Sequence, residues 1–416
     1  MLSFLVLPFF FLATLSLLAW LYILLHPARP WDFQPVGDDT EIPPLPDGIA
    51  FPCVAVIVPA RNESESLPRT LPALLKQDYP AEYSVFLIDD RSTDNTAQIA
   101  RDIAQRVRAE NKLTVIGGAP LPESWAGKVW ALDQGAKAAA KTGAEFFLLT
   151  DADILHAPSS LRRLVSESLI HCGAGGPPTL GLNSRMARLR CESPAERLLI
   201  PAFVYFFNIL YPMRRVNNSR DPLASAAGGC VLLSREAWTR LGESFDSIKS
   251  EIIDDVNLAR QVKGRGLPIR LSLSCSEVVS LREYPHLADI WKMVRRTAFT
   301  ELNYSWLRVF GALAGLALMF VVPLAAILAG AFGIIFGASP MLYSVAAVMK
   351  GALGLAIMGH VYAPAMRFFK LPVLFAFSLP LAGVLYGLMT LDSALRHARG
   401  KGVQWRDPAA AKNNTI

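Results

Sequence analysis

The chain has 416 residues and a formal net charge of +6. This length leaves room for two or three domains. The hydrophobic fraction is 52% and the charged fraction is 18%, whereas roughly 25% of the residues in a soluble domain are charged. The positive charge suits contact with anionic lipid or phosphorylated ligands. No nucleic-acid partner is expected, because the sequence has neither a long basic run nor zinc-finger spacing.

The excess of apolar residues is concentrated at the two ends of the chain. Residues 1–25 form an apolar run that is long enough to cross a bilayer as a helix. No basic segment precedes this run and no small-residue cleavage site ends it, so it predicts a transmembrane anchor rather than a signal peptide. Arg29 follows the run and favours a cytoplasmic location for the next part of the chain. Residues 26–50 are rich in proline and predict an extended linker.

Near the other end, residues 309–392 are expected to form transmembrane helices. The region contains three apolar runs, at residues 309–338, 341–363 and 371–391. Arg367 and Lys370 predict a cytoplasmic turn between the second and third runs. Four full crossings would place the basic, cytoplasmic-type tail at residues 393–416 on the outside, against the positive-inside tendency. We therefore expect one run to be re-entrant or a hairpin, and the long first run is the candidate.

The middle of the chain, residues 51–284, has the mixed composition of a water-soluble domain. Short apolar, β-branched runs predict buried strands, and the first is expected to stop at Pro59. The strand-like runs are residues 53–58, 83–88, 113–116 and 146–149, and helix-like segments lie at 95–110 and 127–141. This alternation predicts an α/β fold with an open, mostly parallel sheet and helices on both faces.

Charged residues follow three of these predicted strands. Sheets of this type bind ligands at the carboxyl ends of their strands. A lone polar residue at a strand end usually marks only a turn, but three strands that deliver charge to one edge predict a binding site. These residues are Arg61 and Glu63 after the first strand, Asp89 and Asp90 after the second, and Asp151 and Asp153 after the fourth.

Several other kinds of site lack their sequence motifs. The chain contains no P-loop, and its glycine-rich stretch at residues 173–178 lacks the last glycine of a dinucleotide fingerprint. The motifs G-x-S-x-G and H-E-x-x-H do not occur either, so the sequence favours neither a serine hydrolase nor a zinc protease.

Asp151 and Asp153 form a D-x-D pair. Residues i and i+2 of an extended segment point to the same side, so both carboxylates can face one cation. Carboxylate oxygens suit Mg²⁺ or Mn²⁺, and such an ion can bridge two phosphate oxygens and offset the charge of a departing diphosphate. The D-x-D pattern also occurs by chance, so its weight comes from the two other strand ends at the same edge.

A second acidic element lies at residues 251–260. Its apolar positions 252, 253, 256 and 259 predict a packed helix face that holds Asp254 and Asp255 at the rim of the site. Transfer of a group to a hydroxyl needs a base, and a positioned carboxylate suits that role. The alternative is an acidic helix N-terminus that only complements the helix dipole.

Taken together, several motifs resemble those of the inverting glycosyltransferases of family 2. They are residues 54–63 (VAVIVPARNE), 88–96 (IDDRSTDNT), Gly127-Lys128 before Ala131-Leu132, 150–153 (TDAD), Gly228-Gly229 and Asp254-Asp255. Their order and spacing over residues 50 to 300 imply a GT-A fold. The resemblance also implies a metal-dependent transferase that uses a nucleotide sugar, most often a uridine diphosphate sugar.

The resemblance implies a role for each matching position. Asp255 would be the general base, with Asp254 in the place of the family's glutamate. Gly228 and Gly229 would give the acceptor close access to the backbone. Asp151 and Asp153 would carry the metal and ribose contacts. The other nucleotide-sugar contacts would come from Pro59, Arg61, Glu63, Asp89, Asp90 and Lys128, with Arg295 or Arg296 at the leaving diphosphate.

Within that family the chain is most similar to the hopene-associated glycosyltransferases of bacterial hopanoid gene clusters. The resemblance covers the anchor, the TDAD turn, residues 291–302 (WKMVRRTAFTEL) and residues 391–405. It implies a multi-pass protein of the bacterial inner membrane whose catalytic domain faces the cytoplasm, with a lipid acceptor such as a hopanoid. Processive synthases carry Gln-x-x-Arg-Trp where this chain has residues 294–297 (VRRT), which implies transfer of a single sugar.

Two segments could bring a lipid acceptor to the site. Residues 198–213 are apolar and aromatic and predict either a core helix or a segment in the headgroup layer, while residues 285–308 predict an amphipathic interfacial segment. Other functions remain open at this point. They are transfer to polyprenyl phosphate, processive polysaccharide synthesis, and a membrane scaffold whose transferase domain is inactive.

Overall fold

The computed structural model describes residues 6–33, 35–36, 41–45, 47–170 and 179–400. The chain forms two compact units. One, here called the sheet unit, comprises Gln34–Arg190 and Met213–Glu283, and the other, the helical unit, comprises Met1–Phe33, Cys191–Pro212 and Tyr284–Ile416. The predicted domain at residues 51–284 therefore includes a segment, Cys191–Pro212, that belongs to the helical unit.

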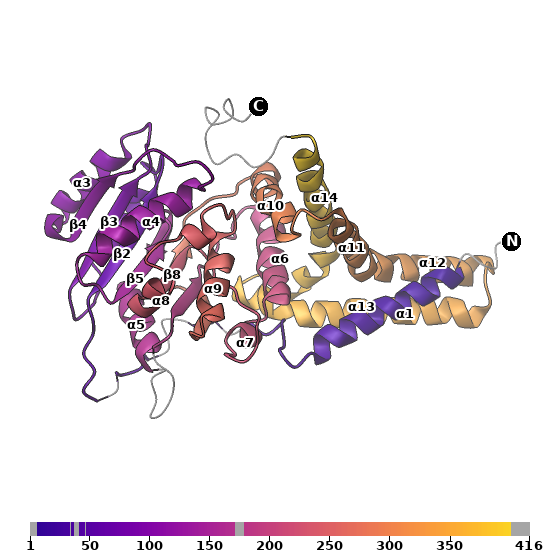
Figure 1. Ribbon diagram of the computed structural model, residues 1–416. Coiled ribbons are helices and arrows are strands. Elements are labelled where there is room, and N and C mark those ends of the chain that lie inside the picture. Colours follow the sequence, from indigo (N-terminus) through magenta and orange to yellow (C-terminus); the bar gives the residue numbers. More distant parts are fainter. Residues whose placement is uncertain (1–5, 34, 37–40, 46, 171–178, 401–416) are drawn as a thin grey trace. The chain divides into compact units, whose positions relative to one another are not determined.

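The sheet unit is built on a mixed, mostly parallel sheet (Figure 1). Its strand order is β1-β9-β7-β8-β5-β2-β3-β4, and only β8 runs antiparallel to its neighbours β5 and β7. The strands are β1 (Pro35–Val36), β2 (Val54–Ala60), β3 (Tyr83–Asp89), β4 (Leu113–Gly117), β5 (Phe146–Thr150), β7 (Leu182–Met186), β8 (Cys230–Ser234) and β9 (Ile269–Ser274). A small antiparallel pair joins β6 (Ile154–His156) to β10 (Val278–Ser280).

Seven α-helices accompany these strands in the described part of the sheet unit. They are α2 (Leu67–Leu75), α3 (Thr96–Arg106), α4 (Gly127–Ala140), α5 (Ser160–Ile170), α7 (Met213–Val216), α8 (Arg235–Arg240) and α9 (Asp254–Gly264). Short 3₁₀ turns occur at Glu110–Lys112 and Asp246–Ile248. The predicted fold class is confirmed, and the four predicted strands and two predicted helices are present within a few residues of their expected ends.

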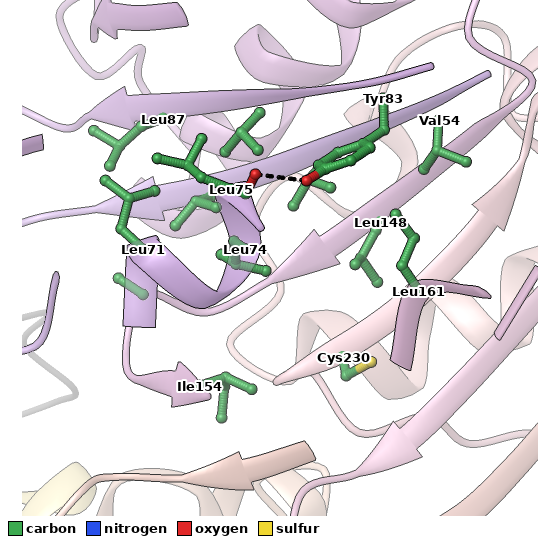
Figure 2. Packing of buried hydrophobic residues seen from close by; sticks show 14 of the residues in the cluster. Val54, Leu71, Leu74, Leu75, Tyr83, Leu87, Leu148, Ile154, Leu161 and Cys230 are labelled. Atoms are coloured by element: carbon green, nitrogen blue, oxygen red, sulfur yellow. Dashed lines mark hydrogen bonds between the residues drawn. The ribbon is translucent and has the colours of Figure 1, made fainter. Parts of the chain in front are cut away.

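Helices cover both faces of the sheet because successive strand residues point to opposite sides. On one face Val54, Leu87 and Leu148 pack with Leu71 and Leu74 of α2 (Figure 2). Tyr83 is buried in the same cluster and donates its hydroxyl proton to the carbonyl of Leu75 over 2.7 Å. Such a buried hydroxyl needs a partner, since leaving it unpaired costs about 1–3 kcal/mol.

On the opposite face α4 lies very close to the sheet. A Cβ at Gly135 would lie 2.6 Å from Ile57 and 2.5 Å from Ile88. Only glycine permits that approach, because the isoleucine atoms belong to buried side chains of two neighbouring strands. The close contact holds the N-terminus of α4, which carries Lys128, near the carboxyl ends of β2 and β3.

Two local expectations were wrong. The first strand does not stop at Pro59 but continues to Ala60. Proline is tolerated there because β5 pairs with β2 only as far as Ile57, so the missing N–H leaves no ladder partner unsatisfied on that side. Helix α9 begins at Asp254, so positions 252 and 253 precede the helix, and its buried residues are Val256, Leu258, Ala259 and Val262.

The proline-rich linker is partly built into the sheet unit. Pro35 and Val36 pair with the edge strand β9. The carbonyls of Glu41 and Pro43 accept hydrogen bonds from Arg163 and Ser166 of α5. These contacts fix part of the segment that was expected to be only an extended spacer.

The helical unit contains four stretches that are long and apolar enough to cross a membrane: Val6–Leu25, Trp306–Phe336, Met341–Phe368 and Val373–Ala398. They comprise α1 (Val6–Leu25), α11 (Trp306–Leu316), a π-helical segment (Ala317–Val321), α12 (Val322–Phe336), α13 (Met341–Phe368), a 3₁₀ segment (Val373–Ser378) and α14 (Leu379–Ala398). The unit also contains α6 (Pro194–Leu210) and α10 (Leu287–Glu301).

Small residues allow α12 and α13 to pack closely. A Cβ at Gly330 would lie 2.6 Å from the carbonyl oxygen of Ser344, and one at Gly351 would lie 2.5 Å from that of Pro323. Contacts of this kind are typical of helices that associate in a bilayer, where apolar side chains gain little from leaving lipid.

Helix α6 is a buried element of the helical unit. It starts with a capping box in which Ser193 and Glu196 satisfy each other's backbone N–H groups. Tyr205 is buried against Tyr362 of α13, and the Leu199 carbonyl accepts a hydrogen bond from Tyr386 of α14. Of the two predictions for residues 198–213, these contacts favour the core helix.

Candidate active site

The loops after β2 and β3 are joined by hydrogen bonds. The N–H of Asn62 donates to the Ser92 hydroxyl over 2.9 Å, and the Asn62 side chain accepts from the N–H of Thr93 over 2.8 Å. The N–H of Glu63 donates to the Thr96 hydroxyl over 2.9 Å. The two motifs around Asn62 and Ser92 therefore form one structure at the edge of the sheet, as the sequence predicted.

Arg61 and Asp90 meet across these two loops. Their side chains lie 3.4 Å apart, and Asp90 is 5% exposed. Burial raises the pKa of Asp90, although the neighbouring Arg61 guanidinium acts in the opposite direction. Asp89, one residue earlier, accepts a hydrogen bond from the N–H of Ser92 over 3.1 Å. Pro59, Arg61, Asp89 and Asp90 thus lie at the ends of two adjacent parallel strands.

Asp151 and Asp153 follow β5, and each is paired with a cation. Lys128 Nζ lies 2.8 Å from Asp151 Oδ1, and Arg282 Nε lies 3.0 Å from Asp153 Oδ2. Burial raises the pKa of Asp153, and the negative charges of Asp151 and Glu63 add to this effect, whereas Arg282 opposes it. Glu63 is therefore an electrostatic neighbour of the D-x-D pair.

Lys128 connects the D-x-D turn to the acidic element at the start of α9. Its ammonium lies 3.5 Å from Asp254 Oδ2 in addition to its contact with Asp151. Burial disfavours the charged form of Lys128, but the carboxylates of Asp151 and Asp254 outweigh burial and raise its pKa. Lys128 is thus a fixed positive charge between two separate acidic motifs.

Asp255 is held by backbone donors. Its Oδ2 accepts a hydrogen bond from the N–H of Gly228 over 2.7 Å, and its Oδ1 accepts from the N–H of Val256 over 2.8 Å. Burial and then the adjacent charge of Asp254 raise the pKa of Asp255 to about 6, although Lys128 and the two backbone donors act against them. A carboxylate with a pKa in this range is suited to accept a proton near neutral pH.

Gly228 suits this arrangement because even a methyl group there would be in tight contact with Lys128 and Asp255. A Cβ at Gly228 would lie 3.1 Å from Lys128 Nζ and 3.2 Å from Asp255 Oδ2. A Cβ at the next residue, Gly229, would lie 3.1 Å from the Ile154 side chain. The structure thus places Gly228, Lys128 and Asp255 next to one another, with Gly229 adjacent in the chain.

A buried hydrogen-bond chain supports the glycine loop from behind. Thr150 donates its hydroxyl proton to the Gly229 carbonyl over 2.8 Å and lies 2.8 Å from His156 Nε2. Since the threonine proton is already used, the network assigns the Nε2–H tautomer to His156. His156 Nδ1 lies 3.2 Å from the Ser160 hydroxyl. Burial lowers the pKa of His156 to about 4, so this imidazole is neutral at physiological pH.

The donor set is compatible with a hard divalent ion. Within the described residues no group of three or more His, Cys, Asp or Glu side chains is arranged to hold a metal by itself. Mg²⁺ needs no such cage, because it is commonly bound by one or two carboxylates together with substrate phosphates and water. Asp151 and Asp153 offer that pair. Burial is the main cause of the raised pKa of Asp153, and the negative charges of Asp151 and Glu63, which a cation would offset, add to it.

Sequence reasoning missed several contributors to the site. Arg282 stands far from Asp153 in the chain, and His156 is a lone buried histidine, so neither matched a motif. The apolar floor of a small pocket beside Asp254 and Asp255 was also missed. It is lined by Val129, Leu132, Leu149, Val231, Phe245, Ile248 and Leu258.

Arg295 and Arg296 lie on α10 of the helical unit rather than in the sheet unit. Arg295 is 3.4 Å from Asp392 of α14, which also accepts a hydrogen bond from the indole of Trp291 over 2.8 Å. Their predicted contact with the leaving diphosphate stays a prediction.

Residues 55–172 match the family described as Glycosyl transferase family 2. That range runs from β2 through the D-x-D turn to the end of α5. This part of the chain is therefore similar to glycosyltransferase family 2 domains, and its sheet is of the GT-A type.

The chain is similar to two curated transferases. One is the undecaprenyl-phosphate 4-deoxy-4-formamido-L-arabinose transferase of Pseudomonas fluorescens, with 32% identity over 127 residues, which is 28% of this chain and 33% of that protein. The other is the 4,4'-diaponeurosporenoate glycosyltransferase of Staphylococcus haemolyticus, with 33% identity over 108 residues, which is 26% of each protein. The chain thus spans a third or less of the length of these curated relatives.

Among solved structures, the chain resembles the mannosyltransferase PcManGT from Pyrobaculum calidifontis, determined in complex with GDP-Man and Mn²⁺. The TM-score is 0.51 and the identity is 20%, over 96% of this chain and 100% of that one. At this identity the likeness supports the fold and not a shared substrate.

Proposed function

We propose that this protein is an inverting glycosyltransferase of a bacterial inner membrane that moves one sugar from a nucleotide sugar to a lipid hydroxyl. The observation that carries the proposal is the position of Asp255. Its carboxylate is fixed by the Gly228 N–H, has a raised pKa, and belongs to the same charged cluster as Lys128 and the D-x-D pair. A proton acceptor and a diphosphate-binding edge are thus combined in one site.

In the proposed reaction, Asp255 takes the proton of the acceptor hydroxyl. The acceptor oxygen then forms a bond to the anomeric carbon while the bond from that carbon to the phosphate oxygen breaks. The nucleoside diphosphate leaves with the electron pair, and attack from the opposite face inverts the anomeric configuration. A base positioned in this way typically contributes a factor of about 10²–10⁴ to the rate.

The donor would be held at the carboxyl ends of β2, β3 and β5. Pro59, Arg61, Glu63, Asp89 and Asp90 would surround the nucleoside, and Lys128 would neutralise part of the diphosphate charge. Mg²⁺ or Mn²⁺ on Asp151 and Asp153 would supply further charge neutralisation. Arg282 would keep the Asp153 carboxylate oriented through the ion pair described above.

A lipid acceptor is supported by the four apolar helices of the helical unit. It is also supported by the names of the two similar transferases, which specify undecaprenyl phosphate and 4,4'-diaponeurosporenoate. We propose a hopanoid hydroxyl as the acceptor, with Gly228 and Gly229 at its point of entry and the amphipathic segment at residues 285–308 beside the bilayer. The transferase would face the cytoplasm, where nucleotide sugars are available, and the donor would be a UDP-sugar.

Transfer to polyprenyl phosphate is the second candidate, and the undecaprenyl-phosphate transferase similarity favours it. One experiment separates the two. The purified full chain is reconstituted with total bacterial lipid, Mn²⁺ or Mg²⁺ and a panel of UDP- and GDP-sugars, and the lipid products are identified by mass. A glycosylated neutral terpenoid supports the leading proposal, and a glycosylated polyprenyl phosphate supports the second. Repeated addition of sugar would identify a processive synthase, and no transfer from any donor would contradict all three.

A further inference from the structure

The four apolar stretches of the helical unit do not form equivalent contacts. Helices α1, α12 and α13 pack along one another over most of their length. At one end of this bundle a Cβ at Gly333 would lie 3.0 Å from Val6 and 2.4 Å from Ser344. At the other end Trp20 donates its indole N–H to the Met319 carbonyl over 3.0 Å. We call the end at Val6 and Gly333 the far end of the bundle, and the end at Trp20 and Met319 the near end.

The near end is also where α14 begins. Phe377, just before α14, lies against Gly359 in the second half of α13. A Cβ at Gly359 would lie 3.2 Å from the Phe377 ring. A Cβ at Gly383 would lie 2.5 Å from the ring of Phe320, which itself packs edge-on against Trp20. The start of α14 is thus level with residues that mark the near end.

From there α14 follows α11 away from the far end. Gly387 lies against Leu313 and Leu316, and a Cβ at Gly387 would lie 3.4 Å from Leu313. Ala394 is buried with Val309 and Phe299, and Ser393 donates a hydrogen bond to the Arg295 carbonyl. Figure 1 shows α14 running across the direction of α12 and α13.

This course leaves the far part of the bundle without α14. From Phe320 to Phe336 the helix rises by roughly 24 Å at about 1.5 Å per residue. That rise is most of the hydrocarbon core, which is about 30 Å thick. Because the contacts of α14 lead from Phe320 to Val309, in the direction opposite to Phe336, α14 does not run through this layer.

The distribution of charge favours the same topology. The sequence has no charged side chain in residues 1–5, which precede α1 in the chain, or in residues 337–340, which connect α12 to α13. Basic residues flank the near end at Arg29, Arg367 and Lys370. If α14 crossed the bilayer, Arg396, Arg399, Lys401 and Arg406 would be the only basic side chains on the far side, against the positive-inside tendency.

One face of α14 carries exposed apolar side chains. Leu381, Val384, Leu388 and Leu395 are between 38% and 56% exposed, and their spacing places them on one side of the helix. On the neighbouring α11, Leu307 is 82% and Phe310 is 60% exposed. An apolar helix face that ends in arginines and adjoins a transmembrane bundle fits the interface of an anionic leaflet.

We propose that α14 is an interfacial helix that lies in the headgroup layer at the near end, and that the chain crosses the membrane three times. Helices α1, α12 and α13 make the crossings. The basic tail then lies on the same side as Arg29 and Arg367. The long run at residues 309–338 is not re-entrant, since it bends at its π-helical segment so that α11 accompanies α14 and α12 crosses. This inference is independent of the transferred sugar and of its acceptor.

The depth of α14 in the bilayer tests this inference. Leu381→Cys, Leu388→Cys and Leu395→Cys are each labelled with a fluorophore in the full chain, reconstituted in vesicles with shallow or deep spin-labelled lipids. An interfacial helix gives equal, predominantly shallow quenching at all three positions. Deeper quenching at Leu388 than at the two outer positions would overturn the proposal. Leu342→Cys and Met349→Cys on α13 are the matched reference, where Met349 is expected to be the deeper.

Sidedness gives a second measurement that needs no substitution. Alkaline phosphatase or green fluorescent protein is fused to the full-length chain after residue 416, and separately after Gly337 between α12 and α13. Three crossings predict opposite reporters at the two positions, with fluorescence at residue 416 and phosphatase activity after Gly337. The same active reporter at both positions would overturn the proposal, because a fourth crossing brings the C-terminus to the far side.

Discussion

The sheet unit and the helical unit treat charge in opposite ways. At the edge of the sheet, Lys128 lies among Asp151, Asp254 and Asp255, and each of these carboxylates has a fixed donor or cation. In the bundle of α1, α12 and α13, Lys350 is an isolated charge that donates to the Thr14 hydroxyl over 2.7 Å and lies 3.4 Å from the centre of the Phe10 ring. The sheet unit thus derives its chemistry from concentrated charge, whereas the helical unit derives its packing from close backbone contact.

The largest effect is expected when one carboxylate is removed from the charged cluster around Lys128. Asp255→Asn keeps the shape of the side chain but removes the base, so we expect kcat to fall by about 10²–10⁴-fold with little change in donor binding. Single-turnover sugar transfer and donor affinity are measured on the same preparation. Asp102→Asn, on the exposed face of α3, is the control and should keep full activity. A variant at Asp255 with wild-type turnover would refute the base assignment.

The buried histidine makes the stability of the sheet unit depend on pH. The pKa of His156 is lowered to about 4 in the folded chain, so its stabilising effect is complete above the unfolded pKa of about 6.5 and is lost as the pH falls towards 4. The loss amounts to about 3 kcal/mol of unfolding free energy, from about 1.4 kcal/mol per unit of pKa. Proteolysis-detected unfolding of wild type and His156→Gln between pH 7 and 4 measures it.

The His156→Gln variant should lose less stability over this range than the wild type. His286→Gln provides the matched control, because His286 is exposed at the start of α10. This second variant should retain the wild-type dependence. Parallel curves for wild type and His156→Gln would show that the buried imidazole does not titrate as its surroundings indicate.

Close packing in the helical unit is tested by adding one methyl group. In Gly351→Ala the new Cβ would meet the Pro323 carbonyl oxygen at 2.5 Å, so α12 and α13 must separate, at a cost of about 1–3 kcal/mol. Thermal unfolding in detergent gives the shift in midpoint. Gly311→Ala on α11 has open space around its Cβ and should be neutral or slightly stabilising, since alanine favours helix. Equal midpoints for the two variants would contradict the packing argument.

The smallest predicted effect concerns the rate as a function of pH. The pKa of Asp255 is raised to about 6, and only its ionised form accepts a proton. We therefore expect kcat/KM, which reports ionisation of the free enzyme, to be constant well above pH 6 and to fall by about tenfold per pH unit well below it. The rate of sugar transfer at subsaturating substrate between pH 5 and 8 measures this. A profile that stays flat down to pH 5 would assign the proton to another acceptor.

The sequence alone predicted the open, mostly parallel sheet, four of its strands (β2, β3, β4 and β5) and the charged residues that follow three of them. These strands are short apolar runs, and each charged residue comes directly or almost directly after the end of its own strand. Arg61, Asp90, Asp151 and Asp153 could therefore be assigned to one edge of the sheet without coordinates. The glycine pair, and the choice of Asp255 rather than Asp254 as the base, came from a family resemblance. Local pattern suffices here because parallel strands bring their ends together whatever their exact register.

Only the tertiary structure decided how these groups are paired. The contacts of Lys128 with Asp254, Arg282 with Asp153 and Gly228 with Asp255 join segments that are distant in sequence. The sequence leaves the membrane topology open for the same reason. Hydropathy shows that α14 is long and apolar enough to span a bilayer, but it does not show the direction in which the helix runs. Its course along α11 depends on side-chain contacts with Phe320 and Val309. Pairing and direction are properties of three-dimensional packing, and no periodicity along the chain encodes them.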